Sequence, residues 1–253
     1  MHSIRRYLGP GIAAGAMLAV LGISPGAFAA QNPCRFEPQF DALSALLANP
    51  KDNDLEHVRA ELAIRKSLLT NILDCALGEI HGLAGTLGAV PSDDPDIADL
   101  AKRFQGRLDD ASAYYNSEKS RVGDLGIWGS KDMAKTIADR RDSYLNLLTE
   151  EIAQFVIWAK NQDLFHIAEN RLSQIQTTTK FLKLIDNQET SDLVQKAKEN
   201  FVKAKELNNE ARQALKRMDI SEDSLTLIKN SLEALAETYK NFFDVSKAVS
   251  LPQ

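Results

Sequence analysis

Apolar residues recur every three or four positions along most of this chain, which is the spacing of one face of an α-helix. Polar or proline-containing segments separate the periodic stretches. No proline lies between Asp96 and Leu251, and no glycine between Ser130 and Leu251, so strands joined by tight turns are excluded. The prediction is an all-α protein whose helices cover residues 39–48, 54–89, 95–123, 130–160, 161–186, 191–218 and 222–249.

Short connections predict that consecutive helices run antiparallel. We expect an elongated antiparallel helical bundle of two tandem three-helix modules, over residues 30–160 and 161–253, which share a long helix. A single globular bundle of five or six helices is the alternative. The long stretch from 130 to 186 has only a polar interruption at 161–163, which favours one continuous or gently bent helix over two.

The same periodicity predicts which side chains face the core and which residues cap the helices. Pro38 suits the first turn of a short helix whose apolar residues, Phe40, Leu43, Leu46 and Leu47, should face inward. Asp94 and Pro95 are expected to cap and open the helix over 95–123. The stretch over 54–89 should bury a stripe made of Val58, Leu62, Leu69, Ile72, Ala76, Ile80, Leu83 and Leu87.

A second face of the stretch over 54–89 carries Cys75, Gly78, Gly82 and Gly85, which share a side of the helix through their spacing. A glycine inside a helix costs up to about 1 kcal/mol relative to alanine. We therefore expect another backbone, the Cys34 segment and the short helix after it, to approach this face closely. The alternative is that the helix frays after Gly82.

Residues 1–29 have the pattern of a secretory signal peptide. Arg5 and Arg6 form a basic start, a weakly apolar run follows, and Ala27-Phe28-Ala29 places small residues where a signal peptidase cleaves. Cleavage near Ala29 predicts a periplasmic or secreted protein without stable membrane insertion. A retained anchor is the alternative, although the apolar run is shorter than the ~20 residues that a span needs.

Cys34 and Cys75 are the two cysteines of the chain. In an exported protein the simplest pairing is one disulfide between them, and two free thiols are the alternative if the chain is not exported. A bond that closes a loop of about 40 residues stabilises a fold by roughly 4 kcal/mol in the chain-entropy description.

Charge and motifs narrow the function classes. The chain has 30 basic and 35 acidic residues without a basic block, which argues against nucleic acid and anionic membrane surfaces as partners. Motifs for a nucleophilic serine, a phosphate-binding loop and haem attachment are absent, so neither enzymatic activity nor a cofactor is predicted. His57 and His166 each follow an aspartate by one helical turn, at Asp54 and Asp163, which is the basis of a metal- or haem-binding alternative.

Three aromatic residues are the candidate partner contacts. Trp128 lies in a predicted loop, Gly123 to Gly129, before Ser130 as the expected cap of the next helix. There it either plugs the end of the core, which we favour, or anchors a partner. Tyr114 and Phe243 each adjoin a core aromatic residue and are expected to be exposed.

Together these features predict an exported, non-enzymatic helical protein of the cell envelope, which acts as a scaffold, spacer or partner-binding module. Its partner would be another envelope or secreted protein. The alternatives are the metal- or haem-binding bundle with His57 or His166, and an amphipathic, chaperone-like bundle that binds lipid or unfolded clients.

Overall fold

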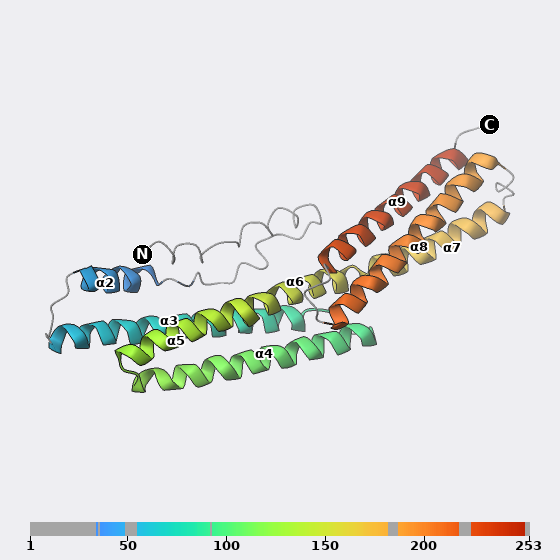
Figure 1. Cartoon of the computed structure of the whole chain (residues 1–253). Helices are drawn as coiled ribbons and strands as arrows, with labels where there is room; N and C mark the ends of the chain where they lie inside the picture. Colours follow the sequence, from blue (N-terminus) through green and yellow to red (C-terminus); the bar gives the residue numbers. More distant parts are fainter. Residues whose placement is uncertain are drawn as a thin grey trace. The chain divides into compact units, whose positions relative to one another are not determined.

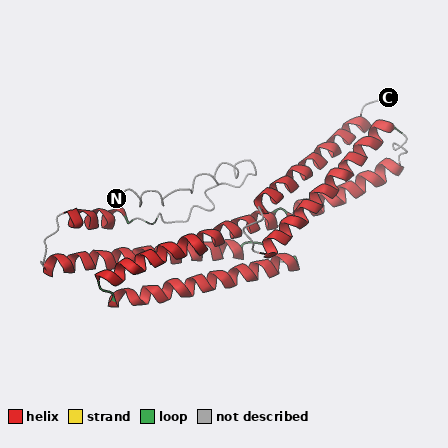
Figure 2. Ribbon diagram, in the orientation of Figure 1, coloured by secondary structure: helices red, strands yellow, loops and turns green. Residues whose placement is uncertain are grey.

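The computed structural model describes residues 34, 36–48, 55–91, 93–181, 187–217 and 224–250, and its regular structure is entirely helical (Figure 2). The all-α prediction is therefore confirmed for this part of the chain. The α-helices are, in order, α2 (Glu37–Ala48), α3 (Leu55–Gly88), α4 (Pro95–Arg121), α5 (Ile127–Arg140), α6 (Asn146–Lys160), α7 (Gln162–Phe181), α8 (Gln188–Arg217) and α9 (Ser224–Ser250) (Figure 1).

Several predictions fall on residues outside the described ranges: the signal peptide with its cleavage site, and the start at Asp54 of the helix predicted over 54–89. The chain divides into two compact units, one made of Met1–Gly82 with Tyr115–Met133 and one of Leu83–Tyr114 with Ala134–Gln253. Two tandem modules that meet at residue 160 stay a prediction. No helix in the described part of the chain is both long and apolar enough to span a membrane.

The spacing of apolar residues over 95–125 predicts a buried stripe, and all of its members except the half-buried Leu125 are buried: Ile97, Leu100, Phe104, Leu108, Ala111, Tyr115 and Val122. The α4 residue Phe104 packs against Phe155 of α6, with 5.3 Å between ring centroids. Asp94 caps α4 as predicted, because its Oδ1 accepts hydrogen bonds from the backbone N–H groups of Asp96 (2.7 Å) and Ile97 (3.4 Å). In the larger unit, these contacts place the first part of α4 against the core side of α6.

Asp96 joins the start of α4 to the end of α8. Its Oδ2 lies 2.5 Å from Nη1 of Arg212, and its Oδ1 lies 2.6 Å from Nζ of Lys216. The hydrogen bond from Lys216, assisted by the positive charges of Arg212 and Lys216, holds the pKa of Asp96 below its ordinary value of 3.8.

Because the pKa of Asp96 is lowered in the folded chain, the stabilisation that this ion-pair network contributes depends on pH. The network stabilises the fold above the unfolded-state pKa, and this contribution is lost as pH falls through the lower folded-state pKa. Because the side chains are partly exposed, we expect Asp96→Asn to cost about 1 kcal/mol at neutral pH. Urea unfolding should show the difference at pH 7 and its disappearance in strong acid. An equal difference at both pH values would contradict this account.

The stretch after α4 differs from the prediction at two points. A 3₁₀ turn, Val122–Asp124, ends α4, and α5 begins at Ile127, inside the predicted loop. Ser130 is therefore not a cap: it is buried within α5, where its hydroxyl donates to the carbonyl of Ile127 at 2.7 Å. One π-helical turn, Arg141–Leu145, then leads into α6.

The predicted continuous helix is interrupted at Asn161, so α6 and α7 are separate helices. The backbone N–H of Asn161 donates to Trp158 O (3.2 Å), and that of Leu164 donates to Asn161 O (3.1 Å), so the ladder tightens to i→i+3 here. Side-chain amides of Asn161 and Gln162 satisfy the carbonyls of Ile157 and Trp158, each at 2.7 Å. The polar interruption therefore ends the helix through side-chain capping, without a glycine or proline.

The helices α7, α8 and α9 share one core in the larger unit. Along α8 and α9, which lie side by side in Figure 1, small residues recur at every seventh position. Ser231 of α9 donates its hydroxyl to the carbonyl of Ala204 of α8 at 3.1 Å, which only close helices allow. These positions are buried, and apart from Val245 they hold alanine, serine or threonine. They are Thr190, Ala197, Ala204 and Ala211 on α8, and Ser224, Ser231, Thr238 and Val245 on α9.

Fewer of the predicted apolar residues are buried in α2 and α3 than the sequence indicates. In α2 only Leu43 is buried, whereas Phe40 and Leu47 are 42% and 45% exposed. In α3, Val58 is 41% exposed, and the buried positions include Leu68 and Leu73. Regular spacing identifies a helix, but it does not show how far the covering partner extends.

The predicted close approach to the glycines of α3 is wrong. A Cβ atom built at Gly78, Gly82 or Gly85 would meet no atom within 4 Å, and all three residues are exposed. Fraying after Gly82 is wrong as well, because α3 continues to Gly88. The 34 residues of α3 place enough other apolar side chains in contact to hold the helix despite its glycines.

The open glycine face gives a stability prediction. Gly78→Ala and Gly85→Ala should each raise the free energy of unfolding by about 0.5–1 kcal/mol, because alanine restricts the unfolded chain and fits here without contact. Gly129→Ala is the control, since its Cβ would lie 3.2 Å from Leu125 Cδ2 and should gain less. Thermal unfolding measures all three, and destabilisation by Gly78→Ala would mean that this face is covered.

Candidate partner-binding surface

The helix α7 carries exposed apolar residues in addition to its buried apolar face. Phe165, Ala168 and Leu172 are buried against α8 and α9. On another side, Leu164, Ile167 and Phe181 are 40%, 49% and 84% exposed. Positions 164, 167, 171, 174, 178 and 181 share one face of the helix through their spacing of three and four. This exposed face borders α9.

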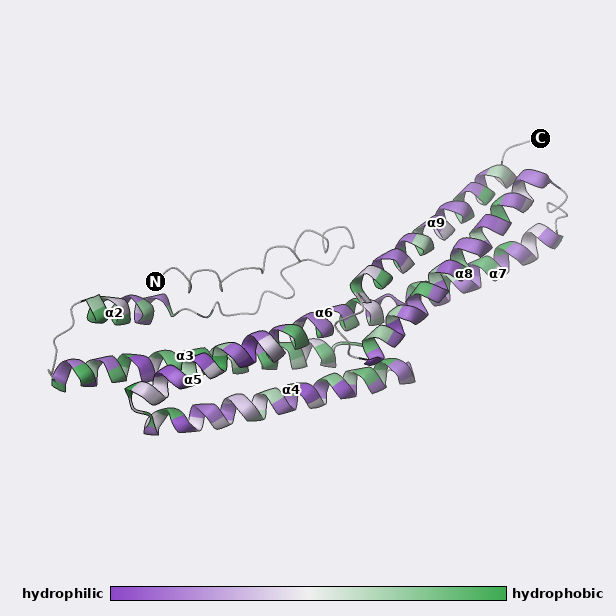
Figure 3. Cartoon of the chain, viewed as in Figure 1, coloured by the Kyte–Doolittle hydropathy of each residue, from purple (hydrophilic) through white to green (hydrophobic). Residues whose placement is uncertain are grey.

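A groove of about 510 Å³ lies between α7 and α9. Its apolar lining comes from the partly buried Ile175 and the buried Phe242 and Val245, and Phe243 stands at its edge with 60% of its surface exposed. The polar part of the lining is made of Arg171, Gln174, Thr178, Thr179, Tyr239 and Ser246. Figure 3 shows green apolar positions among purple polar ones along both helices.

Two polar side chains of the groove form hydrogen bonds within the fold. Thr179 donates its hydroxyl to the carbonyl of Ile175 at 2.8 Å, and Tyr239 donates to the carbonyl of Leu164 at 3.3 Å. Burial raises the pKa of Tyr239 above its ordinary value of 10.0, and the nearby charge of Arg171 opposes that rise. Tyr239 is therefore a neutral hydrogen-bond donor at neutral pH rather than a base.

The lining of the groove contains one charged residue, which is a cation. Arg171 is the ionisable group of its lining besides Tyr239, and Nζ of Lys247 lies 4.2 Å from the ring centroid of Phe243 at the edge. The carboxylate of Glu169, one turn from the groove, is paired with Lys205 of α8 at 2.8 Å. The groove therefore offers an apolar floor, hydroxyl groups and two cations, which suits binding of an amphipathic segment.

The three predicted contact residues lie in different surroundings. Phe243 is at the groove edge. Trp128 is 78% exposed near the start of α5, with Lys131 Nζ 4.8 Å from its ring centroid, so the interpretation of Trp128 as a plug is wrong. Tyr114 is only partly exposed, because the guanidinium of Arg140 covers its ring at 5.2 Å. Of the three, only Phe243 borders a groove.

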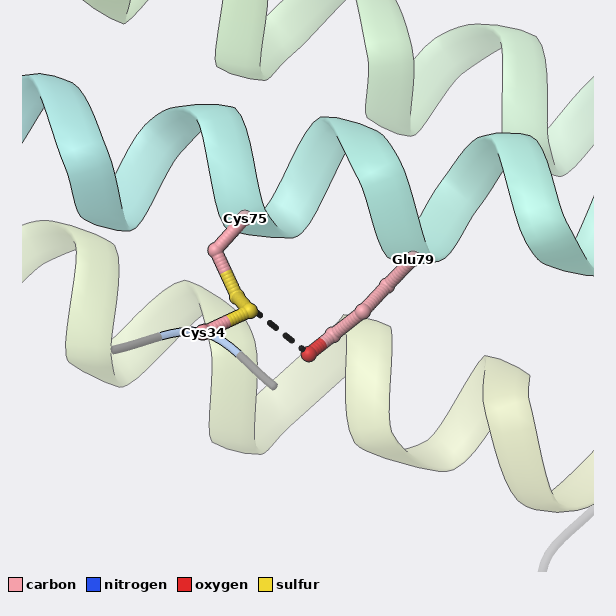
Figure 4. Close-up of a disulfide and its surroundings, with 3 residues drawn as sticks. All are labelled: Cys34, Cys75 and Glu79. Carbon is pink, nitrogen blue, oxygen red and sulfur yellow. Dashed lines mark hydrogen bonds between the residues drawn. A yellow bond between two sulfur atoms is a disulfide. The ribbon is translucent and has the colours of Figure 1, made fainter. Parts of the chain in front are cut away.

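The disulfide between Cys34 and Cys75 is present, as predicted, with 5.6 Å between the Cα atoms. Glu79, one turn after Cys75 on α3, directs its carboxylate at the sulfurs, and its Oε1 lies 3.7 Å from Sγ of Cys75 (Figure 4). A disulfide sulfur carries no proton, so this contact becomes a true hydrogen bond only with a reduced thiol.

Potential metal ligands gather at this same place. In the described ranges, Cys34, Cys75 and Glu79 form the one cluster of three such ligands, with their ligand atoms within 4.8 Å of one another. His57 and His166 are not part of it, and the aspartate predicted to pair with His57 lies outside the described residues. Among the described residues, neither histidine thus lies in a cluster of three potential metal ligands, as the metal-binding alternative would require.

Comparison with known proteins adds no relative: no family profile, no curated protein and no solved structure matches the chain. The groove was also missed from the sequence, and so were the exposed apolar residues of α7. Leu164, Ile167 and Phe181 fall outside the core stripe but keep a helical spacing.

Proposed function

We propose that this chain is an exported, non-enzymatic helical scaffold that binds another envelope or secreted protein through the α7/α9 groove. In this proposal the helices form two tandem three-helix modules, over residues 30–160 and 161–253, that share the helical stretch from 130 to 186. The observation that carries the proposal is the groove of about 510 Å³ with an apolar floor and the exposed Phe243 at its edge.

The groove fits an amphipathic helix of the partner. Two parallel helices, α7 and α9, flank it, and a helix laid between them would bury apolar residues at i, i+3, i+4 and i+7. Arg171 and Lys247 favour carboxylates at the borders of that apolar face. The bound partner segment is therefore expected to carry aspartate or glutamate beside its apolar stripe.

Burial of the exposed apolar residues would contribute free energy to binding. Full burial of a phenylalanine side chain is worth about 1.5–3 kcal/mol, and Phe243 is 60% exposed in the free chain. Leu164, Ile167 and Phe181 extend the apolar surface along α7. Removal of Phe243 should therefore weaken binding by about tenfold, since each 1.4 kcal/mol changes an affinity tenfold.

Site-directed photo-crosslinking in the native cell tests the proposal. A benzoylphenylalanine is placed at Thr178, which lines the groove, and at Lys198, an exposed position of α8 that does not. Position 178 should give one crosslinked partner peptide with an acidic amphipathic helical pattern, and position 198 should not. Equal crosslinking from both positions, or crosslinks only to a second copy of this chain, would contradict it.

A further inference from the structure

The cluster around the disulfide has the chemistry of a metal site in its reduced form. Cys75 and Glu79 are four residues apart on α3, so helical geometry fixes them on one side. Cys34 reaches the same place from the segment before α2. All three residues are partly exposed.

The distances suit a tetrahedral ion. Zinc binds thiolate sulfur at about 2.3 Å and carboxylate oxygen at about 2.0 Å, so neighbouring ligand atoms of a tetrahedral site lie about 3.5–3.8 Å apart. Sγ of Cys75 and Oε1 of Glu79 are already 3.7 Å apart. Once the sulfur–sulfur bond is cleaved, rotation of the cysteine side chains is enough to separate the two sulfurs to the same extent.

We propose that the reduced chain binds one zinc ion through the thiolates of Cys34 and Cys75 and the carboxylate of Glu79, with water as the fourth ligand. A thiol or phosphine reductant supplies two electrons to the disulfide, and the sulfurs take up two protons. Zinc then displaces both protons as it binds the two thiolates. The ion rejoins the segment before α2 to α3, so metal and disulfide are alternative clasps at one place.

The charge and softness of the ligands favour zinc over harder ions. Two thiolates and one carboxylate carry three negative charges, and thiolates select zinc over magnesium or calcium. Three protein ligands with an open fourth position is the arrangement of zinc sites that keep a bound water. Glu79 is the residue that distinguishes this site from any pair of reduced cysteines, so its removal is the sharpest test.

The test uses the full chain, reduced with a phosphine that does not itself bind zinc, under anaerobic conditions. Zinc binding is measured by calorimetry with an equimolar competitor chelator, and cobalt is added separately as a probe, because cobalt bound to thiolate has a charge-transfer band. Glu79→Gln is compared with His81→Gln, which removes an exposed potential ligand two residues further along α3.

We expect one zinc per reduced chain, none per oxidised chain, and a cobalt–thiolate band only after reduction. Glu79→Gln should weaken zinc binding by more than about tenfold, whereas His81→Gln should leave it within about twofold. The inference is overturned if the reduced chain binds no zinc, if Glu79→Gln binds as tightly as the unaltered chain, or if His81→Gln weakens binding. Circular dichroism of each reduced variant confirms that α3 stays helical.

Discussion

Loss of the Cys34–Cys75 bond should lower the free energy of unfolding by about 4 kcal/mol, because the bond closes a loop with a sequence separation of 41 residues. The loop contains α2, whose only buried residue is Leu43, so little apolar contact replaces the covalent link. The segment from Cys34 through α2 depends on the disulfide for its attachment to α3 more than on its own packing.

The Cys34→Ala/Cys75→Ala double variant provides the measurement, with urea unfolding compared against the oxidised chain. Phosphine reduction of the unaltered chain, with a chelator present, is the matched control and should give the same loss. Hydrogen exchange should become fast in α2 and stay slow around Leu73 of α3, which is fully buried. Unchanged unfolding in both samples would mean that α2 is held by contacts other than the disulfide.

Ala204→Leu should destabilise the larger unit by about 3 kcal/mol, because leucine overpacks a seam that has no room for it. Ala204 is completely buried on α8, and its carbonyl accepts the hydroxyl of Ser231 from α9 at 3.1 Å. A larger side chain at position 204 forces the two helices apart and breaks that hydrogen bond. The loss of contact would extend to Phe201 and Leu235 in the same core.

Ala236→Leu is the matched control for the seam. Ala236 is an exposed position of α9, and leucine is nearly as good a helix former as alanine, so stability should change by less than about 0.5 kcal/mol. Chemical denaturation followed by circular dichroism measures both variants. If Ala204→Leu unfolds like Ala236→Leu, the two helices are not held close by their small residues.

The sequence predicted the parts of the fold in which large apolar residues mark the core. In α4 the stripe that begins at Ile97 is buried as expected, because each large side chain in it faces another helix. The spacing of large apolar residues did not predict which polar residues lie in the core. Ser231 and Thr238 are buried on α9, whereas Leu225, an apolar residue of the same helix, is 38% exposed. A seven-residue spacing of small residues was the signal that identifies this seam.

Features that depend on tertiary contacts were harder to predict. The glycines of α3 face open space, and their spacing alone could not distinguish this from a close contact. The break at Asn161 depends on side-chain amides that cap carbonyl groups one turn earlier. Of the contact candidates, Phe243 borders the groove, but the groove itself arises only because α7 and α9 pack with a gap between them.

The central claim is that the α7/α9 groove holds a helix of another protein. Its most direct test is the affinity of a synthetic peptide that covers the partner segment crosslinked at position 178. Phe243→Ala should weaken peptide binding by about tenfold, whereas Val202→Ala, which trims a 45% exposed apolar residue of α8, should leave it within about twofold. Equal affinities of the two variants for the peptide would contradict the claim.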